Sequence, residues 1–182
     1  MPRYFAFLRA VNVGGRTVRM EDLRRHFESF GFREVETFIA SGNVVFETRS
    51  KDARRLEKRI EEGLREALGF EVATFLRTED ELAALADRQP FSQKELDAGV
   101  ALNVAFLKET LDEESTGKLM KLRTEIDDFS VRGREVFWLC RKRQGESAFS
   151  NTVFEKAVGR RATFRGLNTV RRMAAKYLSH NS

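Results

Sequence analysis

The hydrophobic positions of the first half of the chain fall into alternating strand-like and helix-like patterns. Residues 4–8 are apolar at every position, which is typical of a central strand that is covered on both faces. Leu23, Phe27 and Phe30 then recur at helical spacing, and Gly31 suits the end of that helix. The predicted elements are, in order, strand 4–8, a helix from about Met20, strands 35–39 and 44–46, a helix from about Lys51 and strand 72–76. This order is β-α-β-β-α-β, the ferredoxin-like arrangement.

The second half of the chain echoes the first. Residues 104–108 (Val-Ala-Phe-Leu-Lys) repeat the pattern of residues 5–9 (Phe-Ala-Phe-Leu-Arg), and the turn 132–134 corresponds to the hairpin at 41–43. Further along, the segments 157–159 and 162–164 match 67–69 and 73–75. The echoes lie 99, 91 and about 90 positions apart, and an offset that drifts so little indicates a structural duplication.

The predicted fold class is therefore α+β, with two ferredoxin-like β-α-β-β-α-β units from an internal duplication, a connector helix and a C-terminal helix. Thr78 and Glu81 predict a capping box for the connector helix, which Pro90 ends. We expect the last helix to begin at about Thr169. The predicted domains are a first unit at 1–78, an acidic helical connector at 79–98, and a second unit with the C-terminal helix at 99–182.

Several segments resemble the uncharacterised bacterial family named domain of unknown function 1697. They are residues 8–15 (Leu-Arg-Ala-Val-Asn-Val-Gly-Gly), 20–24, 37–46 (Thr-Phe-Ile-Ala-Ser-Gly-Asn-Val-Val-Phe) and 162–170 (Ala-Thr-Phe-Arg-Gly-Leu-Asn-Thr-Val). These motifs fall in both halves of the chain. The family usually has Gly at the position of Ala10. The resemblance implies two ferredoxin-like halves and brings no established activity, substrate or catalytic residues.

Charge is placed unevenly along a chain whose formal net charge is +5. Residues 141–182 carry ten Lys or Arg against Glu146 and Glu155, a balance of +8, whereas residues 79–97 carry six acids against two cations, a balance of −4. The basic region either attracts phosphate or nucleic acid or is a solvated surface.

Composition also bears on location. No apolar run approaches the roughly 20 residues needed to cross a bilayer, and the N-terminus lacks the pattern of a signal peptide. Cys140 is the single cysteine, which suits a reducing compartment. We therefore expect a cytoplasmic protein that does not enter a membrane.

A first candidate site follows from topology. In a β-α-β-β unit the exit of the first strand and the hairpin between the second and third strands lie at the same end of the sheet. The residues that this brings together are Arg9, Asn12, Gly14, Gly15, Ser41, Gly42 and Asn43. Free backbone N–H groups, a helix N-terminus and an arginine would form an anion cradle. Alternatively, the glycines and asparagines serve the turns themselves.

A second candidate site is expected in the other unit. The helix after Ser150 and Asn151 and the helix after Asn168 and Thr169 are predicted to begin at one end of their sheet. Arg165 and the basic segment 141–143 are close by in the predicted fold. Two positive helix ends with several cations would suit phosphate, and the alternative is simple N-capping beside surface arginines.

Catalysis receives little support from the sequence. His26 and His180 have no Cys or acid pair close to them in the predicted fold, and no His/Cys set has metal-ligand spacing. Cys140 reads as a buried, inert thiol. We therefore expect no catalytic residues, no cofactor and no metal.

Three functional hypotheses remain. The first is a non-enzymatic binding module for a phosphate-bearing ligand, either a nucleotide or nucleic acid. The second is an interaction or scaffold protein whose loops are purely structural. The third is an enzyme that acts on a small anionic substrate, although no obvious general base is present. Oligomeric state is not predicted.

Overall fold

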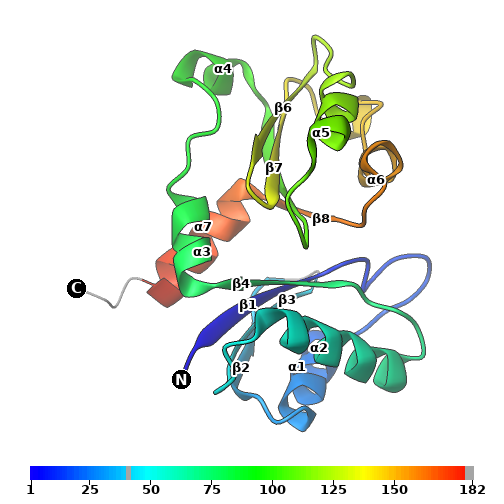
Figure 1. The fold of residues 1–182 in the computed structure, drawn as a ribbon, viewed down its shortest axis with the longest axis vertical. Coiled ribbons are helices and arrows are strands. Elements are labelled where there is room, and N and C mark those ends of the chain that lie inside the picture. The colour runs from blue at the N-terminus through cyan, green and yellow to red at the C-terminus, as the bar shows by residue number, and fades with distance from the viewer. Residues whose placement is uncertain (40–41, 179–182) are drawn as a thin grey trace. The chain divides into compact units, whose positions relative to one another are not determined.

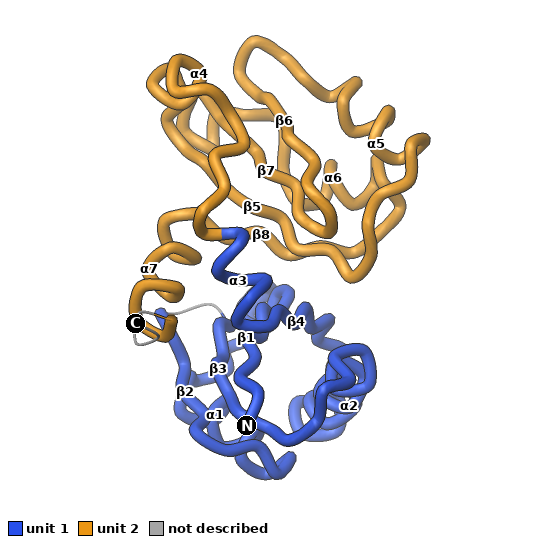
Figure 2. The backbone as a smooth tube through the Cα atoms, turned by 60° about the vertical axis from the view of Figure 1, so that its left-hand side comes forward, with its two compact units in different colours: residues 1–85 blue, residues 86–182 orange. Residues whose placement is uncertain are grey.

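The computed structural model describes residues 1–39 and 42–178. The chain divides into two compact units, 1–85 and 86–182 (Figure 2). Each unit holds one four-stranded antiparallel sheet with helices beside it, so the predicted α+β class is confirmed. The domain boundaries predicted from the sequence stay predictions.

The first unit has the strand order β2-β3-β1-β4, which is the ferredoxin-like order. The sheet pairs β1 with β3 and β4, and β2 with β3, all antiparallel. Its elements are β1 (Arg3–Leu8), α1 (Met20–Ser29), β2 (Arg33–Thr37), β3 (Asn43–Glu47), α2 (Ala53–Leu68), β4 (Thr74–Thr78) and α3 (Glu79–Ala86).

The second unit repeats this order as β6-β7-β5-β8. Its central strand β5 pairs antiparallel with β7 and β8, as β1 does with β3 and β4. Its elements are α4 (Gln93–Ala98), β5 (Ala101–Phe106), α5 (Glu113–Met120), β6 (Asp127–Arg132), β7 (Glu135–Cys140), the 3-10 helix η1 (Gln144–Glu146), α6 (Asn151–Val158), β8 (Thr163–Gly166) and α7 (Leu167–Leu178).

The core of the first unit lies between its sheet and the helices α1 and α2, which cover the same face of that sheet (Figure 1). Strand β1 supplies Tyr4, Ala6 and Leu8 to this core, while Phe5 and Phe7 are buried on its other face. Burial on both faces is what the continuous apolar run predicted.

The core of the second unit lies on the face of its sheet that bears α5 and α6 (Figure 1). Aromatic side chains fill it, with Phe149 packed edge-on against Trp138 at 4.8 Å between ring centres. Its members include Ala105, Leu107, Leu119, Phe129, Val136, Trp138, Phe149 and Phe154, and the partly buried Phe164 packs against them.

Strand register shows how the two repeats correspond, and it corrects one sequence echo. Phe75 pairs with Phe7, whereas Phe164 pairs with Ala105, which corresponds to Ala6. The two phenylalanines therefore project from opposite faces of their sheets. The predicted match of 73–75 with 162–164 is wrong by one residue, because a one-residue slip in a strand exchanges its faces.

Helix ends follow the sequence closely, with one exception. The capping box is present, since Glu81 N–H donates to Thr78 Oγ1 and Thr78 N–H donates to Glu81 Oε2. Gly69 and Gly159 end equivalent helices in the left-handed conformation. The exception is α7, which begins at Leu167 directly after β8, two residues before the predicted start at Thr169.

A buried carboxylate protects the outer edge of the first sheet. Strand β4 lies at that edge, and Glu57 of α2 accepts a hydrogen bond from the N–H of Leu76 at 3.0 Å. In the second unit Glu155 of α6 accepts a bond from Ala162 N–H, just before the edge strand β8. Both carboxylates accept hydrogen bonds from backbone N–H groups that an edge strand would otherwise leave unpaired.

Replacing Glu57 by Ala should lower the free energy of unfolding by about 1–3 kcal/mol, because Leu76 N–H is left buried without its acceptor. Glu62→Ala on the exposed face of α2 is the matched control, and it should change stability by less than about 0.5 kcal/mol. Chemical denaturation of both variants measures the difference. Equal losses in the two variants would show that the edge contact contributes nothing.

Candidate functional site

The exit of β1 and the loop between β2 and β3 lie at the same end of the first sheet. The N–H of Leu8 donates to the carbonyl of Gly42 at 2.9 Å, and Phe7 pairs with Asn43. A Cβ on Gly42 would lie 3.0 Å from Leu8 Cβ, so only glycine allows this approach. Ser41, the remaining hairpin residue predicted for the site, lies outside the described residues.

The two asparagines of this first cluster hold their own loops. Asn12 Oδ1 accepts a hydrogen bond from the N–H of Val18 at 2.6 Å. Asn43 is buried, and its Nδ2 donates to the carbonyl of Phe38 at 3.0 Å. These hydrogen bonds agree with the alternative interpretation, in which the asparagines stabilise the turns themselves.

Gly14 and Gly15 form a tight turn on the surface. Both have positive φ, 61° and 82°, and the N–H of Arg16 donates to the carbonyl of Val13 across them at 3.1 Å. Two consecutive positive φ angles are typical of a type I′ turn, for which Gly-Gly is well suited. Turn geometry therefore accounts for the Gly-Gly pair.

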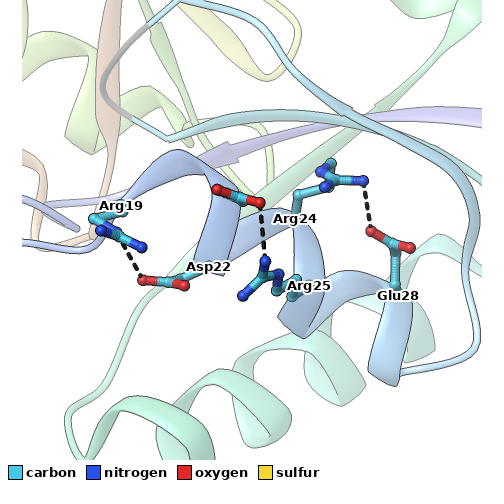
Figure 3. Close-up of polar contacts among 6 residues, drawn as sticks. Arg19, Asp22, Arg24, Arg25 and Glu28 are labelled. Atoms are coloured by element: carbon cyan, nitrogen blue, oxygen red, sulfur yellow. Dashed lines mark hydrogen bonds and ion pairs between the residues drawn. The ribbon is translucent and has the colours of Figure 1, made fainter.

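Several arginines stand on and beside this loop. The N–H of Arg9 donates to the carbonyl of Ala73, and the Arg16 guanidinium lies 4.3 Å from the centre of the Phe70 ring. Arg19 precedes α1 and forms an ion pair with Asp22 at 3.5 Å (Figure 3). Next to it is a cavity of about 220 Å³ lined by Thr17, Val18, Asp22, Arg25, His26 and Leu68.

Two non-glycine residues at this end of the sheet have left-handed backbone. Ala10 has φ 54° and Ile39 has φ 55°. Side chains with a Cβ are disfavoured there. This left-handed conformation explains why the resembled family usually has glycine at the position of Ala10.

Helix caps differ across the molecule. Five helices have a side chain that accepts a hydrogen bond from their first turn, namely Asp52 for α2, Thr78 for α3, Ser92 for α4, Asp112 for α5 and Ser150 for α6. Arg19 gives α1 no such bond, and among the described residues none is made to α7, which Gly166 precedes. Helix α1 follows the first loop that the sequence singled out, and α7 contains Asn168 and Thr169 in its first turn.

The serine and asparagines of the second predicted cluster lie at the start of α6 and in the first turn of α7. Ser150 caps α6 by accepting from Val153 N–H at 3.3 Å, and Asn151 Nδ2 donates to the carbonyl of Ala162 at 3.1 Å. Ala162 precedes β8, whereas Asn168 and Thr169 follow it, so the strand separates the two pairs. Asn151 is hydrogen-bonded at the entry of β8, and the predicted convergence of the two helix starts stays a prediction.

Arg165 lies on β8 immediately before the uncapped helix. Its Nη1 donates to Thr163 Oγ1 at 2.7 Å and to the carbonyl of Phe164 at 2.8 Å. Burial lowers the pKa of Arg165 to about 10, which reflects the cost of removing its charge from water. At neutral pH the guanidinium remains charged.

Asn103 is a buried polar residue that the sequence analysis did not single out. It is 8% exposed, and its Nδ2 has no hydrogen-bond partner. It pairs with Gly166 on one side and with Trp138 on the other, so all three residues share one face of the sheet. The signal in the sequence that could have identified Asn103 is a polar residue within an apolar strand, at the position that corresponds to Tyr4 in the first repeat.

Cys140 is buried and its Sγ donates to the carbonyl of Lys142 at 2.9 Å. Burial is the main cause that raises the pKa of this thiol, so little of it is thiolate at neutral pH. In the described part of the chain, no three His, Cys, Asp or Glu side chains gather as a metal site. Nor does any described helix have the length and apolar character required to cross a membrane.

These features belong to a protein of the α+β class with a duplicated four-stranded sheet. Residues 1–137 match the family described as "Protein of unknown function (DUF1697)", and the chain belongs to that family. No curated protein matched the chain. It is similar in fold to a solved structure described as conserved bacterial protein SP0830 from Streptococcus pneumoniae. The identity is 21%, the TM-score is 0.75, and the match covers 97% of this chain and 98% of the other.

Ala10→Gly should raise the free energy of unfolding by about 1 kcal/mol, because glycine adopts positive φ without a Cβ penalty. Ala67→Gly, on the exposed face of α2, is the control and should lower stability by about 1 kcal/mol. Thermal and chemical denaturation measure both changes. A loss of stability in Ala10→Gly would contradict the strained conformation.

Proposed function

We propose that this protein is a binding module for a phosphate-bearing ligand and that it catalyses no reaction on it. The observation that carries the proposal is the start of α7, to which no described side chain gives a capping hydrogen bond. A helix N-terminus carries a partial positive charge and free N–H groups, and both favour an anion.

The surroundings of that helix support an anionic ligand. Arg165 lies two residues before α7 and adds a positive charge to the strand that leads into it. The segment 141–182 is strongly basic, with ten Lys or Arg against two acids. A positive region of this kind concentrates phosphates near the site before they bind.

The first unit supports the same class of ligand more weakly. Its uncapped helix α1 begins beside the exposed Gly14-Gly15 turn, and Arg16 and Arg19 flank this turn. Glu21 and Asp22 lie in the first turn of α1 and already complement its positive end. We therefore place the main site in the second unit.

The test is thermal denaturation in low salt with inorganic phosphate, AMP, ATP and a single-stranded RNA, each against chloride of equal ionic strength. A ligand that binds only the folded state stabilises it by about 2.7 kcal/mol at a hundred times its dissociation constant. We expect a concentration-dependent rise in Tm with at least one phosphate compound, and a smaller rise at high salt. No rise with any of the four would contradict the proposal.

A second candidate function is protein interaction through the loop end of the first unit. Val13 and Ile39 are 52% and 44% exposed there, and Ile39 holds a strained backbone. Strain and exposed apolar surface are both features of contact sites. If this function holds, a double Val13→Asp and Ile39→Asp variant loses its binding partner on copurification and keeps its phosphate response. Retention of the partner would contradict it.

A further inference from the structure

Strand β6 forms an edge of the second sheet that is regular along its whole length. Among the described strands it pairs only with β7, and all six of its residues face β7 in one unbroken register. The other edge strands are interrupted or protected. Strand β2 has a register shift between Arg33 and Glu36, and Glu57 accepts a hydrogen bond from β4. Strand β8 has only four residues. A long, regular edge is the kind that accepts a further strand.

Register and one hydrogen bond show which backbone groups of β6 point outward. The N–H of Arg141 donates to the carbonyl of Ile126 at 2.8 Å, and the register of β6 on β7 places these two residues opposite each other. Hydrogen-bonded and non-hydrogen-bonded pairs alternate along an antiparallel ladder. The even-numbered residues of β6 therefore bond to β7, whereas Asp127, Phe129 and Val131 direct their backbone groups away from it.

Local contacts satisfy the outward groups at the start of the strand. The N–H of Asp127 donates to Thr124 Oγ1 at 3.1 Å, and its carbonyl accepts from the N–H of Thr124 at 3.0 Å. The N–H of Phe129 donates to Asp128 Oδ1 at 2.8 Å. A side chain that bonds to its own strand in this way keeps other strands from pairing there.

Two outward groups remain in the middle of the strand. The carbonyl of Val131 accepts from Arg132 Nη1 at 3.4 Å. In the part of the chain that the structure describes, this leaves the carbonyl of Phe129 and the N–H of Val131 without a hydrogen-bond partner. The acceptor and the donor lie on either side of Ser130 and point the same way.

This pattern selects a parallel strand. In a parallel pair, a residue donates to the carbonyl before, and accepts from the N–H after, the residue that it faces. A residue opposite Ser130 would therefore bond to the carbonyl of Phe129 and to the N–H of Val131. An antiparallel strand would instead bring a carbonyl against the N–H of Phe129, where the Asp128 carboxylate already lies.

We propose that the outer edge of β6 binds an extended peptide of another protein, which joins the four-stranded sheet as a parallel fifth strand. A second copy of this chain does not fit the requirement, because a two-fold symmetric dimer joins equivalent strands antiparallel. The proposal concerns a different part of the second unit from the start of α7 and does not depend on phosphate binding.

Side chains along the edge define the chemistry of the peptide. The residue after the one that faces Ser130 would lie beside Val131, which is half-buried against the core. A β-branched apolar residue there would extend this packing. The next residue would lie beside Arg132, which is exposed and has no ion pair with any described residue. An acidic residue would complement it. The expected motif is Val or Ile followed by Asp or Glu.

The test is a titration of isotope-labelled protein with acetyl-Ser-Thr-Thr-Val-Glu-Thr-Ser-amide, followed by amide NMR. We expect saturable shifts along β6 that are largest at Val131, because its N–H gains an acceptor. A nitroxide on the N-terminus of the peptide should broaden the amide of Asp127 and spare that of Gly133, because a parallel peptide starts where β6 starts. The peptide of reversed sequence should bind at least about tenfold more weakly.

Variants of the edge provide matched controls. Val131→Pro removes the N–H that the peptide needs, and proline is accepted in an edge strand where the N–H faces outward. Val131→Thr keeps that N–H and is the control. We expect Val131→Pro to bind at least about tenfold more weakly and Val131→Thr to bind as the wild type does. Arg132→Glu should reverse the charge preference, so that it binds a peptide with Lys in place of Glu more tightly than the original.

The same bonds are also tested from the side of the peptide, in case Val131→Pro fails to fold. Methylating the peptide nitrogen of the residue that faces Ser130 removes the donor to Phe129, and the wild-type protein should then bind at least about tenfold more weakly. Equal binding of the methylated peptide, or broadening at Gly133 in place of Asp127, would overturn the inference. An absence of shifts along β6 with every peptide would also overturn it. The proposed phosphate function stands in each of these cases.

Discussion

The pairing of one central strand with two antiparallel neighbours is the constraint from which the rest of each unit follows. Strand β1 lies between β3 and β4, and β5 lies between β7 and β8. Each central strand is buried on both faces, so it cannot move to an edge without exposing apolar side chains to water. That position decides which loops share an end of the sheet. It brings Gly42 against Leu8 in one unit and Gly166 beside Asn103 in the other.

Duplication allows the helix after the fourth strand to be compared between the two units. The scaffold is the same at the end of the fourth strand, and register even places Arg77 and Arg165 at equivalent positions opposite Phe5 and Val104. In the first unit, the threonine and glutamate at the start of α3 supply oxygens that satisfy that helix. In the second unit the same oxygens are absent, and a Cβ on Gly166 would have only Thr169 Oγ1 and Asn103 Oδ1 as near neighbours. Loss of an internal acceptor leaves the fold intact and creates a demand for an external one.

Much of this architecture could be read from the sequence, because its signals are local. A continuous apolar strand, helical spacing of leucines and a Thr-x-x-Glu cap each depend on a few neighbouring residues, and all three are present as predicted. The one-residue error in the echo of 73–75 arose because short edge strands carry too few residues to fix which face is inward. The role of Asn151 was missed because its partner, the carbonyl of Ala162, is set by how α6 packs. The importance of Asn103 depends on what is absent around its amide, and a sequence does not display an unmade hydrogen bond.

The central claim is that the start of α7 is an anion site. A crystal structure of the protein grown with inorganic phosphate tests it most directly. The account predicts tetrahedral density with oxygens within hydrogen-bond distance of the first backbone N–H groups of α7. Water alone at these N–H groups, with no phosphate bound there at saturating concentration, would contradict it.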